Sequence, residues 1–150
     1  MNAKSRNGKL DSELTDRLAH SGLRLTPQRQ QVHEVLREKM DHPTADQVFM
    51  RAKSKMPEIS MATVYNCLDA LVQSNLVRLV NHDKGATRYC SNMQEHHHFY
   101  CVECGGAFDI DAPAGGREPL IRLPAGFKAD RYEIAFRGLC PECVAKKKGK

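Results

Sequence analysis

Apolar residues recur every three to four positions through most of the first half of the chain, which is the period of an amphipathic helix. Leu10, Leu14 and Leu18 predict a first helix that ends near Gly22. A second helix is expected after Thr26-Pro27, because threonine caps a helix and proline is favoured at its first position.

Two further helices follow, and each has a capping signal. Thr44-Ala-Asp-Gln47 fits a capping box at the start of the third helix, and Ser60 is a suitable N-cap for a fourth helix over 61–74. The fourth helix has a continuous apolar stripe, formed by Val64, Cys67, Leu68, Leu71 and Val72. Because Cys67 falls on this stripe, we interpret it as a buried small hydrophobe rather than a metal ligand.

The pattern then changes to short β-strands. Residues 76–80 and 86–89 predict a β-hairpin, and helices followed by such a hairpin are typical of a winged helix-turn-helix. On this wing, Arg78, Lys84 and Arg88 are candidates for contacts to DNA phosphates.

The last third of the chain is less regular. Residues 108–111 and the alternating segment 131–139 predict two more strands. We expect residues 1–9 and the basic tail 146–150 to be disordered.

This last third of the chain contains two Cys-x-x-Cys pairs, which indicate a metal site. Four thiolates match the tetrahedral coordination of a structural Zn²⁺, and the ligands would be Cys101, Cys104, Cys140 and Cys143. The alternatives are two structural disulfides, which suit a secreted chain, or a thioredoxin-like redox pair, which needs a βαβ context that is missing here.

A second group of metal-binding side chains precedes the first pair. His96 and His98 point to one face of an extended segment, and Cys90 lies six residues before His96. Together they suggest a second metal site, and the alternative is an exposed histidine run.

The distribution of charge favours a nucleic-acid-binding protein, and the composition argues against a membrane protein. Residues 1–91 carry 14 Lys and Arg against 10 Asp and Glu, so the basic surplus lies mainly in the half with the predicted winged helix. That half is the better candidate for a nucleic-acid surface. The chain has no apolar run of membrane-spanning length and no signal peptide, so we expect a cytoplasmic protein without a membrane partner.

Several ordered motifs resemble the ferric uptake regulator family of bacterial metal-dependent repressors. They are Gly22-Leu-Arg-Leu-Thr-Pro-Gln-Arg29, His42-Pro-Thr-Ala-Asp46, Ala62-Thr-Val-Tyr65, His96-x-His98-x-x-Cys101-x-x-Cys104-Gly and Gly138-Leu-Cys140-x-x-Cys143. They follow one another in family order from about residue 14 to residue 143.

The resemblance implies an α/β protein with a winged-helix DNA-binding domain and hinge over 1–89, and a metal-binding α/β dimerisation domain with a basic tail over 90–150. It implies a homodimer on a palindromic DNA operator, with the helix from Ala62 as the recognition helix. The predicted DNA-binding residues are Arg24, Thr26, Arg29, Ser60, Ala62, Thr63, Tyr65 and Asn66.

The resemblance also implies a regulatory metal between the two domains. Its ligand positions fall on His42, Cys90, His96, His98 and Asp109. Iron and peroxide sensors have a carboxylate where this chain has Cys90, whereas zinc uptake regulators have a cysteine, and a thiolate favours Zn²⁺ over Mn²⁺ or Fe²⁺. The motifs that begin at His42 and Ala62, however, resemble the sequences of the peroxide-sensing branch more closely. A third family metal site uses a histidine in the strand before the last cysteines, where this chain reads Arg131-Tyr132-Glu133.

We therefore predict a metal-responsive repressor, not an enzyme, with structural Zn²⁺, a regulatory Zn²⁺ or Fe²⁺/Mn²⁺, and no small organic substrate. The first alternative is an iron- or manganese-loaded peroxide sensor or a thiol redox sensor on the same scaffold, and in the thiol sensor Cys90 would be oxidised. A remote alternative is a zinc hydrolase with Glu95 as its general base, but the chain has no His-Glu-x-x-His motif.

Overall fold

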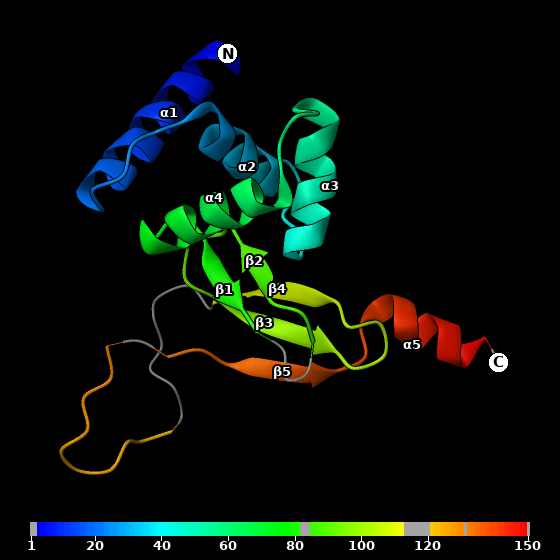
Figure 1. The fold of residues 1–150 in the computed structure, drawn as a ribbon. Coiled ribbons are helices and arrows are strands. Elements are labelled where there is room, and N and C mark those ends of the chain that lie inside the picture. The colour runs from blue at the N-terminus through cyan, green and yellow to red at the C-terminus, as the bar shows by residue number, and fades with distance from the viewer. Residues whose placement is uncertain (1–2, 82–84, 113–120, 131, 150) are drawn as a thin grey trace. The chain divides into compact units, whose positions relative to one another are not determined.

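The structure is a computed structural model that describes residues 3–81, 85–112, 121–130 and 132–149. For residues 3–7 it describes the backbone alone. The chain divides into two compact units, Met1–Met93 and Gln94–Lys150. Cys90 therefore belongs to the first unit. Figure 1 colours the chain from blue at the N-terminus to red at the C-terminus.

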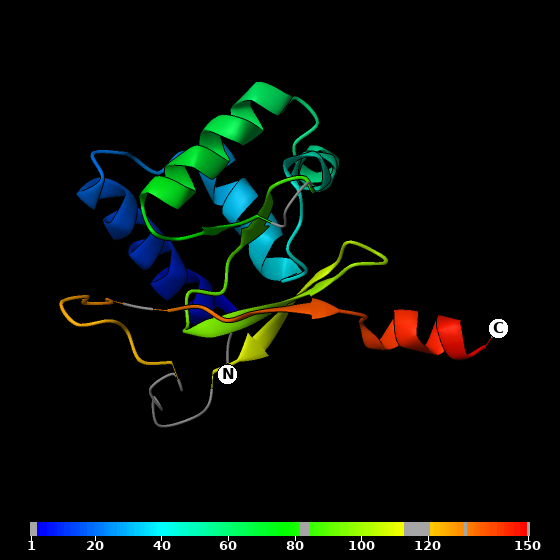
Figure 2. The same cartoon turned by 90° about the horizontal axis from the view of Figure 1, so that it is seen from below.

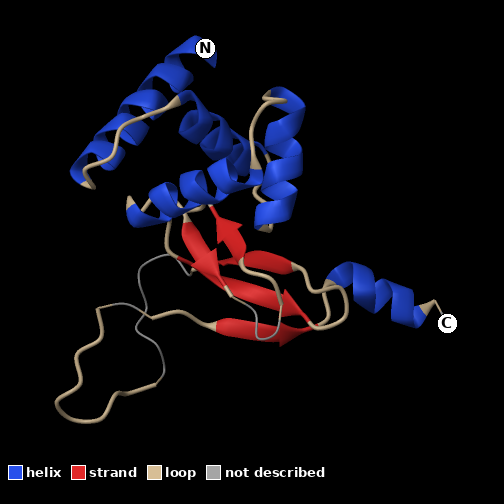
Figure 3. Cartoon of the chain, viewed as in Figure 1, coloured by secondary structure: helices blue, strands red, loops and turns tan. Residues whose placement is uncertain are grey.

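The first unit contains four helices, whose apolar stripes face a common core. They are α1 (Ala3–His20), α2 (Pro27–Glu38), α3 (Ala45–Lys55) and α4 (Met61–Gln73). Figure 3 shows these helices in blue and the strands of the hairpin that follows them in red. The stripe predicted for the fourth helix is confirmed: Val64, Cys67, Leu68 and Leu71 are buried, and Val72 is partly buried against them. Burial raises the pKa of the Cys67 thiol, as expected for an inert core cysteine.

The predicted caps fix where three of these helices begin. Thr26 accepts a hydrogen bond from the Arg29 N–H, and Ser60 accepts one from the Thr63 N–H. Thr44 and Gln47 form the complete capping box. Each cap satisfies an amide that would otherwise be unpaired in the first helical turn.

The expectation of disorder over residues 1–9 is wrong from Ala3 onward, where α1 begins, and residues 1–2 lie outside the described residues. Leu14 and Leu18 anchor this helix in the core. Once a helix is nucleated, each added residue contributes one backbone hydrogen bond. Alanine, lysine and arginine, which occur upstream of this anchor, are intrinsically good helix formers.

The hairpin predicted for the wing is present, although its strands are shorter than expected. β1 (Arg78–Val80) pairs antiparallel with β2 (Arg88–Cys90), and β2 also forms a bridge from Arg88 to Thr44. The Arg78 guanidinium donates to the Met93 carbonyl at 3.3 Å, and that of Arg88 donates to the His42 carbonyl at 2.9 Å. The third predicted phosphate contact, Lys84, lies outside the described residues.

The second unit is a three-stranded sheet followed by a helix (Figure 2). The strands β3 (His96–Cys101), β4 (Ala107–Asp111) and β5 (Ala135–Gly138) lie in the order β4-β3-β5. β3 is antiparallel to β4 and parallel to β5. β4 confirms the strand predicted at 108–111, whereas β5 covers only part of the alternating segment 131–139.

The expectation of a disordered basic tail is wrong over most of its length, because α5 (Pro141–Lys148) includes Lys146, Lys147 and Lys148. Proline at the first helical position favours initiation. The three lysines occupy the last turn, where positive charge interacts favourably with the helix dipole. None of the described helices is both long and apolar enough to span a bilayer.

Candidate metal centres

The four paired cysteines meet at one end of the three-stranded sheet. Cys101 ends β3, and a turn with Gly105 in the left-handed region (φ 70°) brings Cys104 back beside it. Parallel pairing of β3 with β5 sets Cys101 beside Gly138, so that Cys140 follows within two residues. Cys143 then lies in the first turn of α5, and the four sulfurs are all within 4.8 Å of one another.

These sulfurs are spaced for a tetrahedral metal rather than for disulfides. The Sγ atoms of Cys104 and Cys140 are 3.9 Å apart. Zn–S bonds of about 2.3 Å at tetrahedral angles separate neighbouring sulfurs by about 3.8 Å. A disulfide bond would require about 2.0 Å. All six cysteines are in the described part of the chain, and none is disulfide-bonded there.

The surroundings of these four cysteines change the pKa values of their thiols. Backbone N–H groups of Cys104 and Cys140 lower the pKa of Cys101 to about 6, because they donate to its thiolate. Burial, together with the neighbouring Cys140 sulfur, raises the pKa of Cys143 to about 12. Burial and the neighbouring sulfurs thus oppose ionisation of this cluster, and a bound cation would offset the charge of the thiolates.

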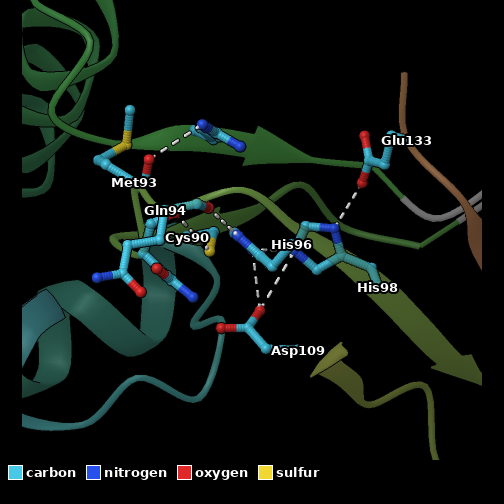
Figure 4. Close-up of polar contacts among 9 residues, drawn as sticks. Cys90, Met93, Gln94, His96, His98, Asp109 and Glu133 are labelled. Carbon is cyan, nitrogen blue, oxygen red and sulfur yellow. Dashed lines mark hydrogen bonds and ion pairs between the residues drawn. The ribbon is translucent and has the colours of Figure 1, made fainter. Parts of the chain in front are cut away.

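A second cluster lies on one face of the same sheet. His96 and His98 alternate on β3 as predicted, and Asp109 lies opposite His98 on β4. The Asp109 Oδ1 atom is 3.1 Å from Nε2 of His96 and 3.4 Å from Nε2 of His98, and the two Nε2 atoms are 3.1 Å apart (Figure 4). Ligand atoms about 2.1 Å from one metal are about 3.0–3.4 Å apart, so this spacing fits a metal site.

Hydrogen bonds at Nδ1 of the two imidazoles determine which ring nitrogen is unprotonated in each neutral ring. Nδ1 of His96 donates to the Gln94 carbonyl at 2.6 Å, and Nδ1 of His98 donates to a Glu133 carboxylate oxygen at 2.6 Å. In the neutral rings, both Nε2 atoms then have lone pairs that point toward the Asp109 carboxylate. Three acceptor atoms that converge in this way form a ready set of ligands for a divalent cation.

Within the first unit, His42 and Cys90 form a smaller pair. The Arg88–Thr44 bridge and the bond from the Tyr89 N–H to the Pro43 carbonyl (3.0 Å) bring these two residues opposite each other. Both are buried, with 3% of their surface exposed, and their ligand atoms are within 4.8 Å of each other. His42 adopts a left-handed conformation with a φ of 53°, and its carbonyl accepts a hydrogen bond from the Arg88 guanidinium.

The predicted DNA-contacting residues separate into exposed and structural ones. The first turns of α4 expose Ala62, Tyr65 and Asn66, and Thr63 is half-buried. Ser60 is exposed but also serves as the N-cap of α4. Arg24, Thr26 and Arg29 form a local network before α2, because Thr26 caps Arg29 and the Arg29 guanidinium donates to the Arg24 carbonyl at 2.6 Å.

Two residues at these sites were not predicted. Glu133, which was named only within the segment Arg131-Tyr132-Glu133, accepts a hydrogen bond from His98. Arg88, which we assigned to the wing, bonds to His42. The alternation of Tyr132, Glu133 and Ile134 indicated that Glu133 faces away from its neighbours, but strand pairing was needed to identify its partner.

The chain matches known proteins along most of its length. The profile of the ferric uptake regulator family matches residues 20–136. The peroxide operon regulator of Bacillus subtilis is 34% identical over 137 residues, which are 89% of this chain and 93% of that protein. The ferric uptake regulation protein of the same organism is 35% identical over 135 residues, covering 86% of this chain and 91% of that protein.

Solved structures have the same fold. The Helicobacter pylori ferric uptake regulator aligns with a TM-score of 0.67 at 21% identity, over 96% of this chain and 95% of that one. The Campylobacter jejuni peroxide stress regulator aligns with a TM-score of 0.62 at 24% identity, over 95% of this chain and all of that one.

Proposed function

Because the chain belongs to the ferric uptake regulator family of metal-responsive transcriptional regulators, we propose that it is a repressor that binds a palindromic operator as a homodimer when a regulatory metal is bound. The proposed ligands of that metal are His42, Cys90, His96, His98 and Asp109. The observation that carries the proposal is the convergence of the Nε2 atoms of His96 and His98 on the Asp109 carboxylate.

We assign the four paired cysteines to a structural Zn²⁺. The support is the 3.9 Å spacing of Cys104 and Cys140, together with a donor set of four sulfurs. Since the cysteines come from two segments 36 residues apart, the metal would connect the turn after β3 to the start of α5. Its role is to stabilise the second unit.

The regulatory site would act by joining the two units. His42 and Cys90 form one half-site, and His96, His98 and Asp109 form the other, with five residues between Cys90 and His96. A metal bound by both halves favours the arrangement of the units in which the two winged helices of a dimer reach successive major grooves. A coupling of about 1–3 kcal/mol would change operator affinity roughly 5- to 150-fold.

DNA would be contacted by the exposed face at the N-terminal end of α4. This face presents Ala62, Tyr65 and Asn66, which have the size and hydrogen-bonding groups to read base edges in a major groove. We also assign Arg24, Thr26, Arg29, Ser60 and Thr63 to the DNA-binding surface. Thr26, Arg29 and Ser60 would act partly by fixing the helix starts.

The homodimer would form through the second unit. β5 is an edge strand of the described sheet, and it exposes Phe136, while Ile134 is exposed just before it. Phe108 and Ile110 of β4 are exposed as well. An apolar sheet surface of this kind is suited to burial against a second copy of the chain.

Cys90 leads us to propose Zn²⁺ as the effector. With a thiolate in place of one carboxylate, the set of three imidazoles, Cys90 and Asp109 is a softer donor set than that of iron and peroxide sensors. The test is to remove the loosely bound metal with a mild chelator and to titrate Zn²⁺, Mn²⁺ and anaerobic Fe²⁺ separately while operator binding is measured. Restoration by buffered Zn²⁺ alone supports the proposal, whereas restoration by Mn²⁺ or Fe²⁺ contradicts the metal assignment.

A peroxide or thiol redox sensor is the second candidate function, because a relative at 34% identity is a peroxide operon regulator. In a thiol sensor, oxidation of Cys90 would release both metal and DNA. Cys90→Ser separates the two functions. A thiol sensor would stop responding to peroxide, whereas a zinc sensor would mainly lose metal affinity. Members of the family are regulators rather than enzymes, so a zinc hydrolase is not supported.

A further inference from the structure

The segment before β5 is held against β3 by three contacts. The Ile134 N–H donates to Nδ1 of His97 at 3.1 Å, and the His98 N–H donates to the Ile134 carbonyl at 3.3 Å. The rings of Tyr132 and His97 stack with their centroids 5.7 Å apart. Both neighbours of Glu133 are therefore fixed on β3.

This register determines where the Glu133 carboxylate lies. Successive side chains of an extended segment point in opposite directions, and so do those of His97 and His98 on β3. Tyr132 stacks on His97, whereas Glu133 reaches the ring of His98. A shift of one residue would direct the carboxylate to the other face and break the contact.

The contact is made to the ring nitrogen that does not face the ligand cluster. Glu133 accepts from Nδ1 of His98 at 2.6 Å, while Nε2 of the same ring is 3.4 Å from the Asp109 carboxylate (Figure 4). A carboxylate that accepts from Nδ1 favours the tautomer in which Nε2 is unprotonated, and it fixes the orientation of the ring. It also makes Nε2 a more basic metal ligand.

His96 and His98 differ in the group that accepts the hydrogen bond from Nδ1. Nδ1 of His96 donates to the backbone carbonyl of Gln94, which every residue type would provide. His98 depends on the side chain of Glu133. The His98 side chain is only 4% exposed and that of Glu133 is 55% exposed, so an accessible carboxylate acts on a buried ligand.

We propose that Glu133 is a positioning residue of the regulatory metal site, which holds His98 with Nε2 directed toward the metal and thereby sets the metal affinity. This inference rests on the proposed function, because it requires His98 to be a ligand. Loss of such a partner lowers metal affinity about 10- to 100-fold in comparable sites.

The test compares Glu133→Ala with Glu133→Gln in the full-length chain with its structural metal intact. Zn²⁺ affinity is measured by competition with a chromophoric chelator in the absence of DNA. We expect Glu133→Ala to bind about 10- to 100-fold more weakly. Glu133→Gln should recover part of the loss, because its amide oxygen still accepts from Nδ1. Glu34→Ala, at an exposed position of α2, is the matched control and should bind like wild type.

His98→Ala and the double variant show whether Glu133 acts through His98. If it does, Glu133→Ala adds no further loss once His98 is absent. The visible absorption bands of bound Co²⁺ should also change in Glu133→Ala, because the geometry of a ligand has changed. Wild-type affinity in Glu133→Ala, or an equal loss with and without His98, would overturn the inference. Unchanged affinity in His98→Ala would instead contradict the proposed regulatory site.

Discussion

Cys90 is the single sulfur ligand of the proposed regulatory site, and it is buried opposite His42. We predict that Cys90→Asp shifts the metal that activates operator binding from Zn²⁺ toward Mn²⁺ and Fe²⁺, because a carboxylate is a harder donor than a thiolate. Operator binding measured during separate metal titrations checks this prediction.

The matched control for Cys90→Asp is Cys67→Ala, which removes a buried thiol from the core of the first unit. It should lower stability modestly and leave the order of metal preference unchanged. If Cys90→Asp keeps the wild-type preference for Zn²⁺, Cys90 does not determine the metal.

His33 should make the first unit sensitive to acid. Burial, and then the nearby charge of Arg37, lower its pKa to about 4, whereas an unfolded histidine has a pKa of about 6.5. Above about pH 6.5 the ring is neutral in both states and has no effect. As the pH falls from about 6.5 to about 4, only the unfolded state binds the proton, so the free energy of unfolding decreases by up to about 3 kcal/mol.

Urea unfolding at several pH values, followed by circular dichroism, tests this prediction. His33→Gln should lose less stability than wild type between pH 7 and pH 4, and His20→Gln, an exposed histidine of α1, serves as the control. A pH dependence of His33→Gln equal to that of wild type would show that His33 is not responsible.

At the residue scale, sequence patterns identified the ligand candidates but not the groups that orient them. His96 and His98 were predictable from their alternation, and the four paired cysteines from their spacing. Glu133 and Arg88 could not be assigned to His98 and His42, because those contacts depend on strand register between segments 35 and 46 residues apart.

Among the individual elements, α4 makes the most direct prediction about DNA. Asn66 and Gln73 are both exposed on this helix, but only Asn66 lies in its N-terminal half. Asn66→Ala should lower operator affinity about 5- to 150-fold, corresponding to about 1–3 kcal/mol for a lost base contact. Gln73→Ala should have little effect, and neither change should alter metal affinity. Equal operator affinities of the two variants would rule out this orientation of α4.

The same elements show why some boundaries were predictable. Thr26, Thr44 and Ser60 are local signals, and each caps the helix that was predicted from it. The ends of α1 and α5 depend on cooperative extension from buried anchors, which short polar segments do not reveal. The shortness of β5 reflects its pairing with the end of β3, a contact that is distant in sequence.

For the whole molecule, we predict that the second unit depends on its structural metal. Cys143→Ser should lose the tightly bound Zn²⁺, and the second unit should then be cleaved rapidly by protease while the helices of the first unit remain. Structural zinc sites contribute about 10–16 kcal/mol in small peptides, which is comparable to the entire stability of a domain. Cys67→Ala should retain the zinc. A protease-resistant second unit in zinc-free Cys143→Ser would contradict the assignment.

The joining of the two units by one metal is the central claim, and His42 is the ligand that tests it. In Zn²⁺-titrated fluorescence anisotropy with operator DNA, wild type should gain about 5- to 150-fold in affinity. His42→Ala should gain nothing while it retains its structural zinc and its dimeric state. His42→Asn serves as a second variant, because asparagine tolerates the left-handed conformation at this position. If both variants bind operator with the zinc dependence of wild type, the metal does not join the two units through His42.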